Sequence, residues 1–378
     1  MINIGFVSDA ISKDTVGVGR YAKNVFLHLA RMAVNPIPVD WRSDKSFLSI
    51  MEEPVASPVV ISNPWPVKKN FLWHFFLLEK LNKTVDFLDM VFDPSQFLHP
   101  LGNLKVPLVY VVHDVSFIKH PECHRRGKKT LFRFFFKDTL QKADCIVCVS
   151  NYTRNELLQY FSVDHDKISV IYEAAEECFR PISNESELGR IRQKYGLPES
   201  FLLYVGTIEP RKNIDQLLHA YHLLKDRIPF PLYIGGKMGW RSASLFKLHE
   251  RLGLIDRVNF LGHVPDDDLP VLYNLATAFI FISKDEGFGL PPLEAMQCGT
   301  PVVISNAGAL PEIAGDAALI TDPDDPYAIG KTLEQICKDN ALQNGLKEKG
   351  LKRSTSFSWE STAKELIMLF QKLTNRSI

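Results

Sequence analysis

The feature that most constrains the fold is a rhythm of short apolar runs, separated by segments long enough to form helices. Such runs are typical of parallel strands, which are covered by helices on both faces of their sheet. The first half of the chain contains the runs Ile2–Val7, Val59–Ser62, Asp89–Phe92, Leu108–Val112, Cys145–Val149 and Ile168–Ile171. The second half contains Phe201–Gly206, Pro231–Gly235, Val258–Leu261, Ala278–Ile282, Pro301–Ile304 and Ala317–Ile320. We therefore predict an α/β protein with two parallel sheets.

The length of the chain also favours two domains. Its 378 residues exceed the ~250 to 300 at which a single hydrophobic core stops growing. A polar, acidic stretch around residues 181–187 interrupts the apolar runs. We predict an N-terminal domain over residues 1–178 and a C-terminal domain over residues 179–356. A C-terminal helix over residues 357–378 is expected to pack back onto the first domain.

Composition narrows the possible functions. With 44 basic and 44 acidic residues the formal net charge is zero, so nothing attracts the chain generally to nucleic acid. Six cysteines are too few for a disulfide framework, and no signal peptide precedes the first run, so we expect a reducing, cytoplasmic setting. Cys145 and Cys148 form a C-x-x-C pattern. They lie in a predicted buried strand, where positions three apart face opposite ways, which argues against a redox or metal site.

The loop with the most specific pattern follows a predicted strand of the second half. In sheets of this kind ligands bind beyond the carboxyl ends of the strands. The segment Glu286-Gly-Phe-Gly-Leu-Pro-Pro-Leu-Glu294 enters a helix through two prolines, which suit a first helical turn. A helix N-terminus offers N–H groups to a phosphate, and the glycines allow close approach of the backbone. The two carboxylates can hold hydroxyl groups of the same ligand.

The spacing Glu-x7-Glu after a strand resembles the signature of the large family 4 of retaining glycosyltransferases, and the resemblance extends over almost the whole chain. It implies the GT-B fold, in which two Rossmann-like domains face each other across a cleft. In that family the first glutamate, here Glu286, lies at the donor sugar, and the second, here Glu294, binds the ribose. The resemblance also implies donor contacts by Phe288, Gly289, Leu290 and, after an earlier strand, Val264.

A second loop of the same half carries two adjacent cations. Arg211 and Lys212 follow the run Phe201–Gly206 at the point where a helical pattern begins. Positive side chains there would stabilise a diphosphate, and more strongly as the leaving group gains charge. The pair also resembles the Arg-Lys phosphate element of the family. We therefore assign both residues a catalytic role in stabilising the leaving group.

Near the N-terminus, the segment Gly17-Val-Gly19-Arg-Tyr-Ala22 has the G-x-G-x-x-A form of a dinucleotide fingerprint, and Asp40 follows at a suitable spacing. A nicotinamide-dependent oxidoreductase is therefore an alternative function. Against it, the loop between Val7 and Gly17 is longer than the tight turn that the fingerprint needs. The segment also resembles the family's N-terminal glycine loop, which contacts the donor phosphate and the acceptor. On that basis Gly17 and Gly19 are assigned to the donor.

Four polar side chains of the N-terminal half are further candidates. His113 and Asp114 follow the run Leu108–Val112, and the resemblance implies a catalytic histidine against the donor sugar. Ser150 matches a neighbouring loop position, although it suits the cap of the next helix equally well. Where many members of the family have Pro-Asn-Gly, this chain has Glu173. Either Glu173 binds a sugar hydroxyl or the loop simply has a different shape.

Two acidic runs, residues 266–268 and 322–325, have the composition of a metal site. Each precedes a predicted helix, where carboxylates cap N–H groups and complement the macrodipole. The resemblance likewise implies that cationic residues and a helix end replace a divalent metal. We expect neither a metal nor another cofactor.

The stretch over residues 124–142 is basic and aromatic. It forms either an ordinary amphipathic helix or a surface that rests on anionic lipid, as in members of the family that act on lipid-linked acceptors. A peripheral contact with the cytoplasmic face of a membrane is therefore one expectation. No apolar stretch is long enough to predict a transmembrane helix.

The residues and the resemblance together predict a retaining hexosyltransferase. It would move a hexosyl group from a nucleoside diphosphate sugar to a glycan or lipid-linked saccharide during surface polysaccharide biosynthesis. The segment His113–Glu122 resembles members that use mannose donors, so GDP-mannose is the first candidate and UDP-glucose stays open. A catalytically silent nucleotide-sugar-binding protein of the same fold is a further alternative, against which intact Glu286, Arg211 and Lys212 argue.

Overall fold

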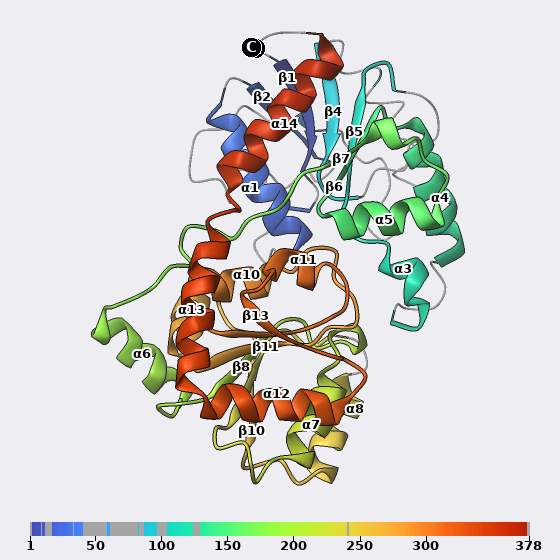
Figure 1. Cartoon of the computed structure of the whole chain (residues 1–378). Helices are drawn as coiled ribbons and strands as arrows, with labels where there is room; N and C mark the ends of the chain where they lie inside the picture. The colour runs from blue at the N-terminus through green and yellow to red at the C-terminus, as the bar shows by residue number, and fades with distance from the viewer. Residues whose placement is uncertain are drawn as a thin grey trace. The chain divides into compact units, whose positions relative to one another are not determined.

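The chain forms two compact units (Figure 1). The computed structural model describes residues 2–8, 10–11, 17–32, 34–40, 59–60, 82, 87–96, 104–123, 129–239 and 242–375. The first unit comprises Met1–Glu173 and Ser358–Ile378, and the second unit comprises Ala174–Phe357. The chain therefore leaves the first unit a few residues before the expected boundary, and the C-terminal segment belongs to the first unit.

In the part of the chain that the structure describes, the first unit is built on a parallel sheet of seven strands in the order β3-β2-β1-β4-β5-β6-β7. Its strands are β1 (Ile2–Val7), β2 (Val34–Asp40), β3 (Val59–Val60), β4 (Met90–Asp93), β5 (Leu108–Val112), β6 (Cys145–Cys148) and β7 (Ile168–Val170). Its helices are α1 (Val18–Ala30), α3 (Ser116–Lys119), η2 (Pro121–Cys123), α4 (Lys129–Lys142), α5 (Asn151–Tyr160), η3 (His165–Lys167) and α14 (Trp359–Thr374). The chain order of the strands reverses between β1 and β4, as in doubly wound folds.

The second unit repeats this plan with six parallel strands in the order β10-β9-β8-β11-β12-β13. The strands are β8 (Leu202–Val205), β9 (Leu232–Gly235), β10 (Val258–Gly262), β11 (Ala278–Phe281), β12 (Val302–Ser305) and β13 (Ala318–Thr321). The helices are α6 (Glu185–Tyr195), η4 (Pro210–Lys212), α7 (Ile214–Leu223), α8 (Ser242–Arg251), η5 (Asp266–Asp268), α9 (Leu269–Leu275), α10 (Leu290–Gln297), α11 (Leu310–Ala314), α12 (Pro326–Lys338) and α13 (Asn340–Ser354). Every predicted run overlaps a strand, and two Rossmann-like sheets confirm the predicted fold class; residues 61 and 62 of one run lie outside the described residues.

Strand β2 is an element that the apolar runs did not predict. It contains Pro36 and Pro38, and proline cannot donate a ladder hydrogen bond. In a parallel strand the N–H and C=O of one residue point to the same neighbour, and the Val39 carbonyl accepts from the Ser8 N–H on the β1 side. The two prolines, one and three positions before Val39, therefore turn their missing N–H groups away from β1. On that side the described part of β3 begins only opposite Val39.

Helix α14 packs within the first unit, beside α1 (Figure 1). The ring of Phe370 lies 5.5 Å from that of Phe92 in β4, and the ring of Trp359 lies 5.8 Å from that of Tyr21 in α1. The Thr362 hydroxyl donates to the Tyr172 carbonyl over 2.7 Å. The last helix of the chain is therefore part of the first hydrophobic core.

Candidate functional site

The topology of the second unit brings two predicted loops together. Strands β8 and β11 are hydrogen-bonded neighbours although β9 and β10 lie between them in the chain, so the order of the strands reverses at this point. Loops at such a switch point form the ligand crevice in doubly wound sheets. The Lys284 N–H, after β11, donates to the Arg211 carbonyl, after β8, over 2.9 Å. The loop with the cations and the loop with Glu286 are thus joined through their backbones.

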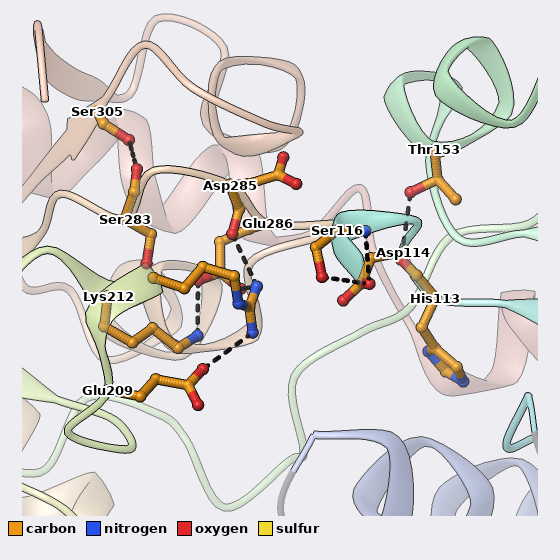
Figure 2. Close-up of polar contacts among 11 residues, drawn as sticks. His113, Asp114, Ser116, Thr153, Glu209, Lys212, Ser283, Asp285, Glu286 and Ser305 are labelled. Carbon is orange, nitrogen blue, oxygen red and sulfur yellow. Dashed lines mark hydrogen bonds and ion pairs between the residues drawn. The ribbon is translucent and has the colours of Figure 1, made fainter. Parts of the chain in front are cut away.

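Four charged side chains meet there, and we call them the Glu286 cluster: Glu209, Arg211, Lys212 and Glu286 (Figure 2). Lys212 Nζ lies 2.6 Å from Glu286 Oε1, and Arg211 Nη1 lies 3.3 Å from Glu286 Oε2. Arg211 also donates to the Asp285 carbonyl over 2.8 Å and pairs with Glu209 over 3.4 Å. The predicted residues Arg211, Lys212 and Glu286 therefore form one charged network. Glu209 is a member that sequence reasoning missed, although it lies two positions before Arg211.

The Glu286 cluster is shielded from solvent, which strengthens its electrostatics. The side chains of Arg211, Lys212 and Glu286 are 15%, 12% and 11% exposed. Burial alone would raise the pKa of Glu286, but the charges of Lys212 and Arg211 outweigh burial and lower it. Burial and the charge of Arg211 lower the pKa of Lys212 against the opposing effect of Glu286. The Lys212 ammonium also lies 5.1 Å from the centre of the Phe281 ring. The cluster therefore holds an ionised Glu286 against Arg211 and Lys212, two cations that could also bind an anionic ligand.

The backbone around Glu286 has the predicted helix start. Gly289 precedes α10 with a φ of 113°, which favours glycine, and a proline follows within the first two helical positions. Leu290 opens the helix, and Phe288 is buried with its ring 5.9 Å from that of Phe357. Gly308, in the loop after β12, was not among the predicted residues. A Cβ at this position would lie 2.5 Å from the Glu286 nitrogen. The Ala309 N–H donates to the Glu286 carbonyl over 2.8 Å, so this glycine lets the loop after β12 support Glu286.

Glu294 and Val264 lie on other elements of the second unit. Glu294 is buried in α10, and its Oε2 accepts a hydrogen bond from the Tyr273 hydroxyl of α9 over 3.0 Å. Tyr273 was not among the predicted residues, because nothing in its local sequence pattern indicates a polar partner. Val264 is buried in the loop after β10, and a Cβ on Gly235 would lie 2.9 Å from its Cγ2. The position of the Val264 side chain therefore requires a glycine at the end of β9.

In the first unit, the structure pairs two of the candidates with each other. His113 Nδ1 lies 3.1 Å from Glu173 Oε1, and His113 Nε2 lies 2.7 Å from the Pro94 carbonyl oxygen. Burial alone would lower the pKa of His113, but the hydrogen bond and charge of Glu173, with the Pro94 carbonyl, raise it. Glu173 is only 4% exposed and has His113 as a partner. Of the two interpretations of Glu173, neither included this contact.

The remaining candidates of the first unit have local structural roles. Asp114 accepts hydrogen bonds from the Ser116 N–H and hydroxyl, over 3.0 and 2.7 Å, at the start of α3 (Figure 2). Ser150 caps α5, because its Oγ accepts the Thr153 N–H over 3.0 Å. Gly17 precedes α1 with a φ of 50°, and Gly19 is buried within the first turn. Asp40 ends β2, but its side chain lies outside what the structure describes.

The two acidic runs serve mainly as helix caps and ion pairs. Asp325 caps α12 by accepting the Tyr327 and Ala328 N–H groups over 2.9 and 3.0 Å. Asp268 pairs with Lys194 and accepts the Tyr195 hydroxyl. Among the described residues, no group of three or more His, Cys, Asp or Glu side chains could hold a metal ion. Burial raises the pKa of the Cys145 and Cys148 thiols, so neither is an activated thiolate.

Models of known families match both halves of the chain. Residues 16–175 match the model described as Glycosyltransferase Family 4, and residues 189–353 match the one described as Glycosyl transferases group 1. An O-antigen chain mannosyltransferase B of Escherichia coli is 37% identical over 291 residues, which make up 76% of this chain and 76% of that protein. The chain belongs to the family 4, group 1 glycosyltransferases. The predicted enzyme class is thereby confirmed, and nothing supports the oxidoreductase alternative.

One further relative of this glycosyltransferase is also named a mannosyltransferase, and one solved structure shares its fold. The serotype-specific mannosyltransferase WbdA of Escherichia coli is 35% identical over 286 residues, which make up 74% of this glycosyltransferase and 35% of WbdA. The crystal structure of Anabaena HepE in complex with UDP and glucose matches with a TM-score of 0.79 at 19% identity, and the match covers 99% of this chain and 100% of HepE. That likeness confirms the GT-B fold of two Rossmann-like domains.

Proposed function

We propose that this retaining glycosyltransferase moves a mannosyl group from a nucleoside diphosphate sugar, with GDP-mannose as the first candidate, to a glycan or lipid-linked saccharide of a surface polysaccharide. The Glu286 cluster at the β8/β11 switch point is the observation that carries the donor class. Its buried cations are suited to a diphosphate, which has the charge and the planar oxygen pairs that arginine recognises. The mannosyl group is supported by relatives that are named O-antigen chain and serotype-specific mannosyltransferases.

The proposed division of labour follows the geometry of the second unit. Arg211 and Lys212 stabilise the negative charge that builds on the leaving diphosphate, and they exchange part of their pairing with Glu286 for pairing with phosphate oxygens. Glu286 faces the sugar, and Glu294 binds the ribose with support from Tyr273. Gly289 and the start of α10 receive the diphosphate. With these cations, the donor requires no divalent metal.

Retention of the anomeric configuration is proposed to follow from departure and attack on one face of the sugar. Glu286 is a weak candidate for a covalent nucleophile, because its two oxygens are held by Lys212 and Arg211. The diphosphate, as it leaves, can accept the proton of the attacking hydroxyl. In this proposal the second unit binds the nucleotide, and the first unit supplies contacts around Gly17, Gly19 and His113.

Helix α4 is the proposed contact with an anionic membrane. Phe134 is 64% exposed, and Arg133 and Lys137 beside it are also exposed, whereas Phe135 and Phe136 are buried. An exposed ring flanked by cations suits the boundary between headgroups and acyl chains. Residues 124–128 of the predicted surface lie outside the described residues, and no described helix is long and apolar enough to cross a bilayer. Co-sedimentation with lipid vesicles tests this contact. We expect the protein to bind anionic but not neutral vesicles, and a Phe134→Ser variant to bind anionic vesicles less. Equal binding to anionic and neutral vesicles would refute the contact.

The donor is tested by thermal unfolding with a panel of nucleotide sugars, followed by a transfer assay. A true donor at about 100 times its Kd stabilises the native state by about 2.7 kcal/mol. We expect GDP-mannose to give the largest shift, and Glu294→Ala to abolish it. A larger shift with UDP-glucose would replace the proposed donor. Absence of binding, transfer and hydrolysis with every donor would favour the catalytically silent alternative.

A further inference from the structure

His113 has both ring nitrogens directed at oxygen atoms of the first unit. Nε2 lies 2.7 Å from the Pro94 carbonyl, and Nδ1 lies 3.1 Å from the Glu173 carboxylate. A backbone carbonyl can only accept, so Nε2 must carry a hydrogen. The Nδ1 position therefore decides the state of the ring. Either Nδ1–H donates to an ionised Glu173, or a protonated Glu173 donates to Nδ1, and in both cases the pair holds one shared proton.

The surroundings favour the ionised arrangement. Glu173 and Asp114 are the carboxylates whose charge acts on the ring, and both raise the pKa of His113 against the opposing effect of burial. Tyr21 of α1 packs edge-on, with ring centres 4.9 Å apart, and burial, with the charge of Glu173, raises the pKa of its hydroxyl so that it stays neutral. An imidazolium that donates from both nitrogens has no lone pair to accept a proton. His113 is therefore unsuited to be a general base.

The backbone of His113 is held as firmly as its ring. The His113 N–H donates to Gln96 Oε1 over 3.0 Å, and the Gln96 amide donates back to the Asp114 carbonyl over 3.1 Å. The Thr153 hydroxyl donates to the His113 carbonyl over 3.3 Å (Figure 2). His113 thus joins the loops after β4 and β5 to the start of α5, and Glu173 adds the segment after β7.

Glu173 also lies at the end of the first unit. It is the last residue before the chain enters the second unit at Ala174. The chain returns at Ser358, and the adjacent Trp359 packs against the same Tyr21 whose ring touches His113. Both points where the chain passes between the units are therefore anchored to His113, one directly and one through Tyr21.

We propose that Glu173 is a positioning residue, which keeps His113 as a doubly protonated imidazolium. In that state His113 is a fixed cation that holds the carboxyl-end loops of the first unit in the arrangement needed for transfer. The Glu173 carboxylate is needed for the charge of His113 more than for the shape of the loop. This inference rests on the proposed function, because it assigns these loops to glycosyl transfer.

The first test is direct and needs no activity. Side-chain ¹⁵N NMR distinguishes an imidazolium from the neutral tautomers, and the His113 signals can be assigned with a His113→Asn variant. We expect wild-type His113 to stay doubly protonated to higher pH than an ordinary histidine, and Glu173→Gln to move its titration to lower pH. Glu177→Gln is the matched control, since Glu177 is exposed in the same segment. A single protonated nitrogen in the wild type at neutral pH would overturn the proposal.

The second test measures transfer as a function of pH. Because the protonated ring is the active form, kcat should fall as pH rises through the pKa of His113, and Glu173→Gln should move that limb to lower pH. On that alkaline limb we expect kcat of Glu173→Gln to be about tenfold lower, as for one lost charge-assisted hydrogen bond, with donor KM little changed. Glu173→Asp should restore most of it. A variant that loses activity equally at every pH would show a structural role only, and an inactive wild type would refute the proposed function but leave the NMR result standing.

Discussion

At the scale of single residues, charge in this glycosyltransferase is set by neighbours from distant loops. Glu286 remains ionised in a buried position because Lys212 and Arg211 lie within 2.6 and 3.3 Å of its oxygens. In our proposal the Glu173 carboxylate stabilises the protonated ring of His113 in the same way. Removing one partner of such a buried pair leaves the other charge without compensation, which costs more than the pair itself contributes. Single substitutions should therefore have large effects at these positions.

Lys212→Ala should lower turnover more than donor affinity. Lys212 is assigned mainly to the additional charge that develops as the diphosphate leaves, and removing one such group lowers kcat by about 10²- to 10³-fold. Steady-state kinetics with varied donor would measure kcat and KM, and Lys247→Ala, at an exposed position of α8, is the control. Thermal unfolding would show whether the variant is folded, and Lys212→Arg should retain part of the activity. A folded Lys212→Ala enzyme with wild-type kcat would rule out the leaving-group role.

At the scale of elements, the loops after β8, β11 and β12 together support the Glu286 cluster. The Lys284 and Ala309 N–H groups connect them, donating to the carbonyls of Arg211 and Glu286. Gly308 allows the loop after β12 to pack against the Glu286 backbone, because it has a φ of 66° and there is no room for a Cβ beside Glu286. The position of the Glu286 carboxylate therefore depends on all three loops. A methyl group added at Gly308 should displace that carboxylate by pushing on the Glu286 backbone, without contacting the carboxylate itself.

Gly308→Ala should weaken donor binding and lower stability. The left-handed backbone costs alanine about 1–2 kcal/mol, and the clash with Glu286 adds to that cost. Gly253→Ala is a matched control, because Gly253 has a φ of 62° and open space around its Cβ position. Thermal unfolding and donor titration would compare the two variants. If Gly308→Ala and Gly253→Ala bind donor equally well, the packing of Gly308 against Glu286 has no part in the site.

At the scale of the whole molecule, the chain ends in the unit where it began. Helix α14 follows the second unit in sequence but buries Phe370 against Phe92 of the first unit. The first unit therefore cannot be complete until the second has been synthesised. Both passages of the chain between the units lie beside the His113 and Tyr21 contacts, so the last helix also supports the candidate residues of the first unit.

Phe370→Ala should destabilise the first unit and leave the second unchanged. Replacing a fully buried phenylalanine by alanine costs about 3–5 kcal/mol. Hydrogen exchange should accelerate at β4 and α1, but not in β8 to β13. Met368→Ala on the same helix is the control, since Met368 is 60% exposed. Equal acceleration in both units, or none in the first, would contradict the assignment of α14 to the first core.

Local sequence patterns determine where many of the strands and helices of this protein begin and end. Apolar runs located the strands of two parallel sheets, and the prolines and glycines of Glu286–Glu294 located the start of α10, because strand burial and helix starts depend on residues close in sequence. The tertiary structure alone decided which loops meet. It joined Arg211 to Glu286, His113 to Glu173 and Gly308 to the Glu286 backbone. It also tolerated two prolines in β2, since their missing N–H groups face away from β1. The physical reason is that the order of strands in a sheet depends on how whole elements pack, and no residue pattern of period 2 or 3.6 encodes it.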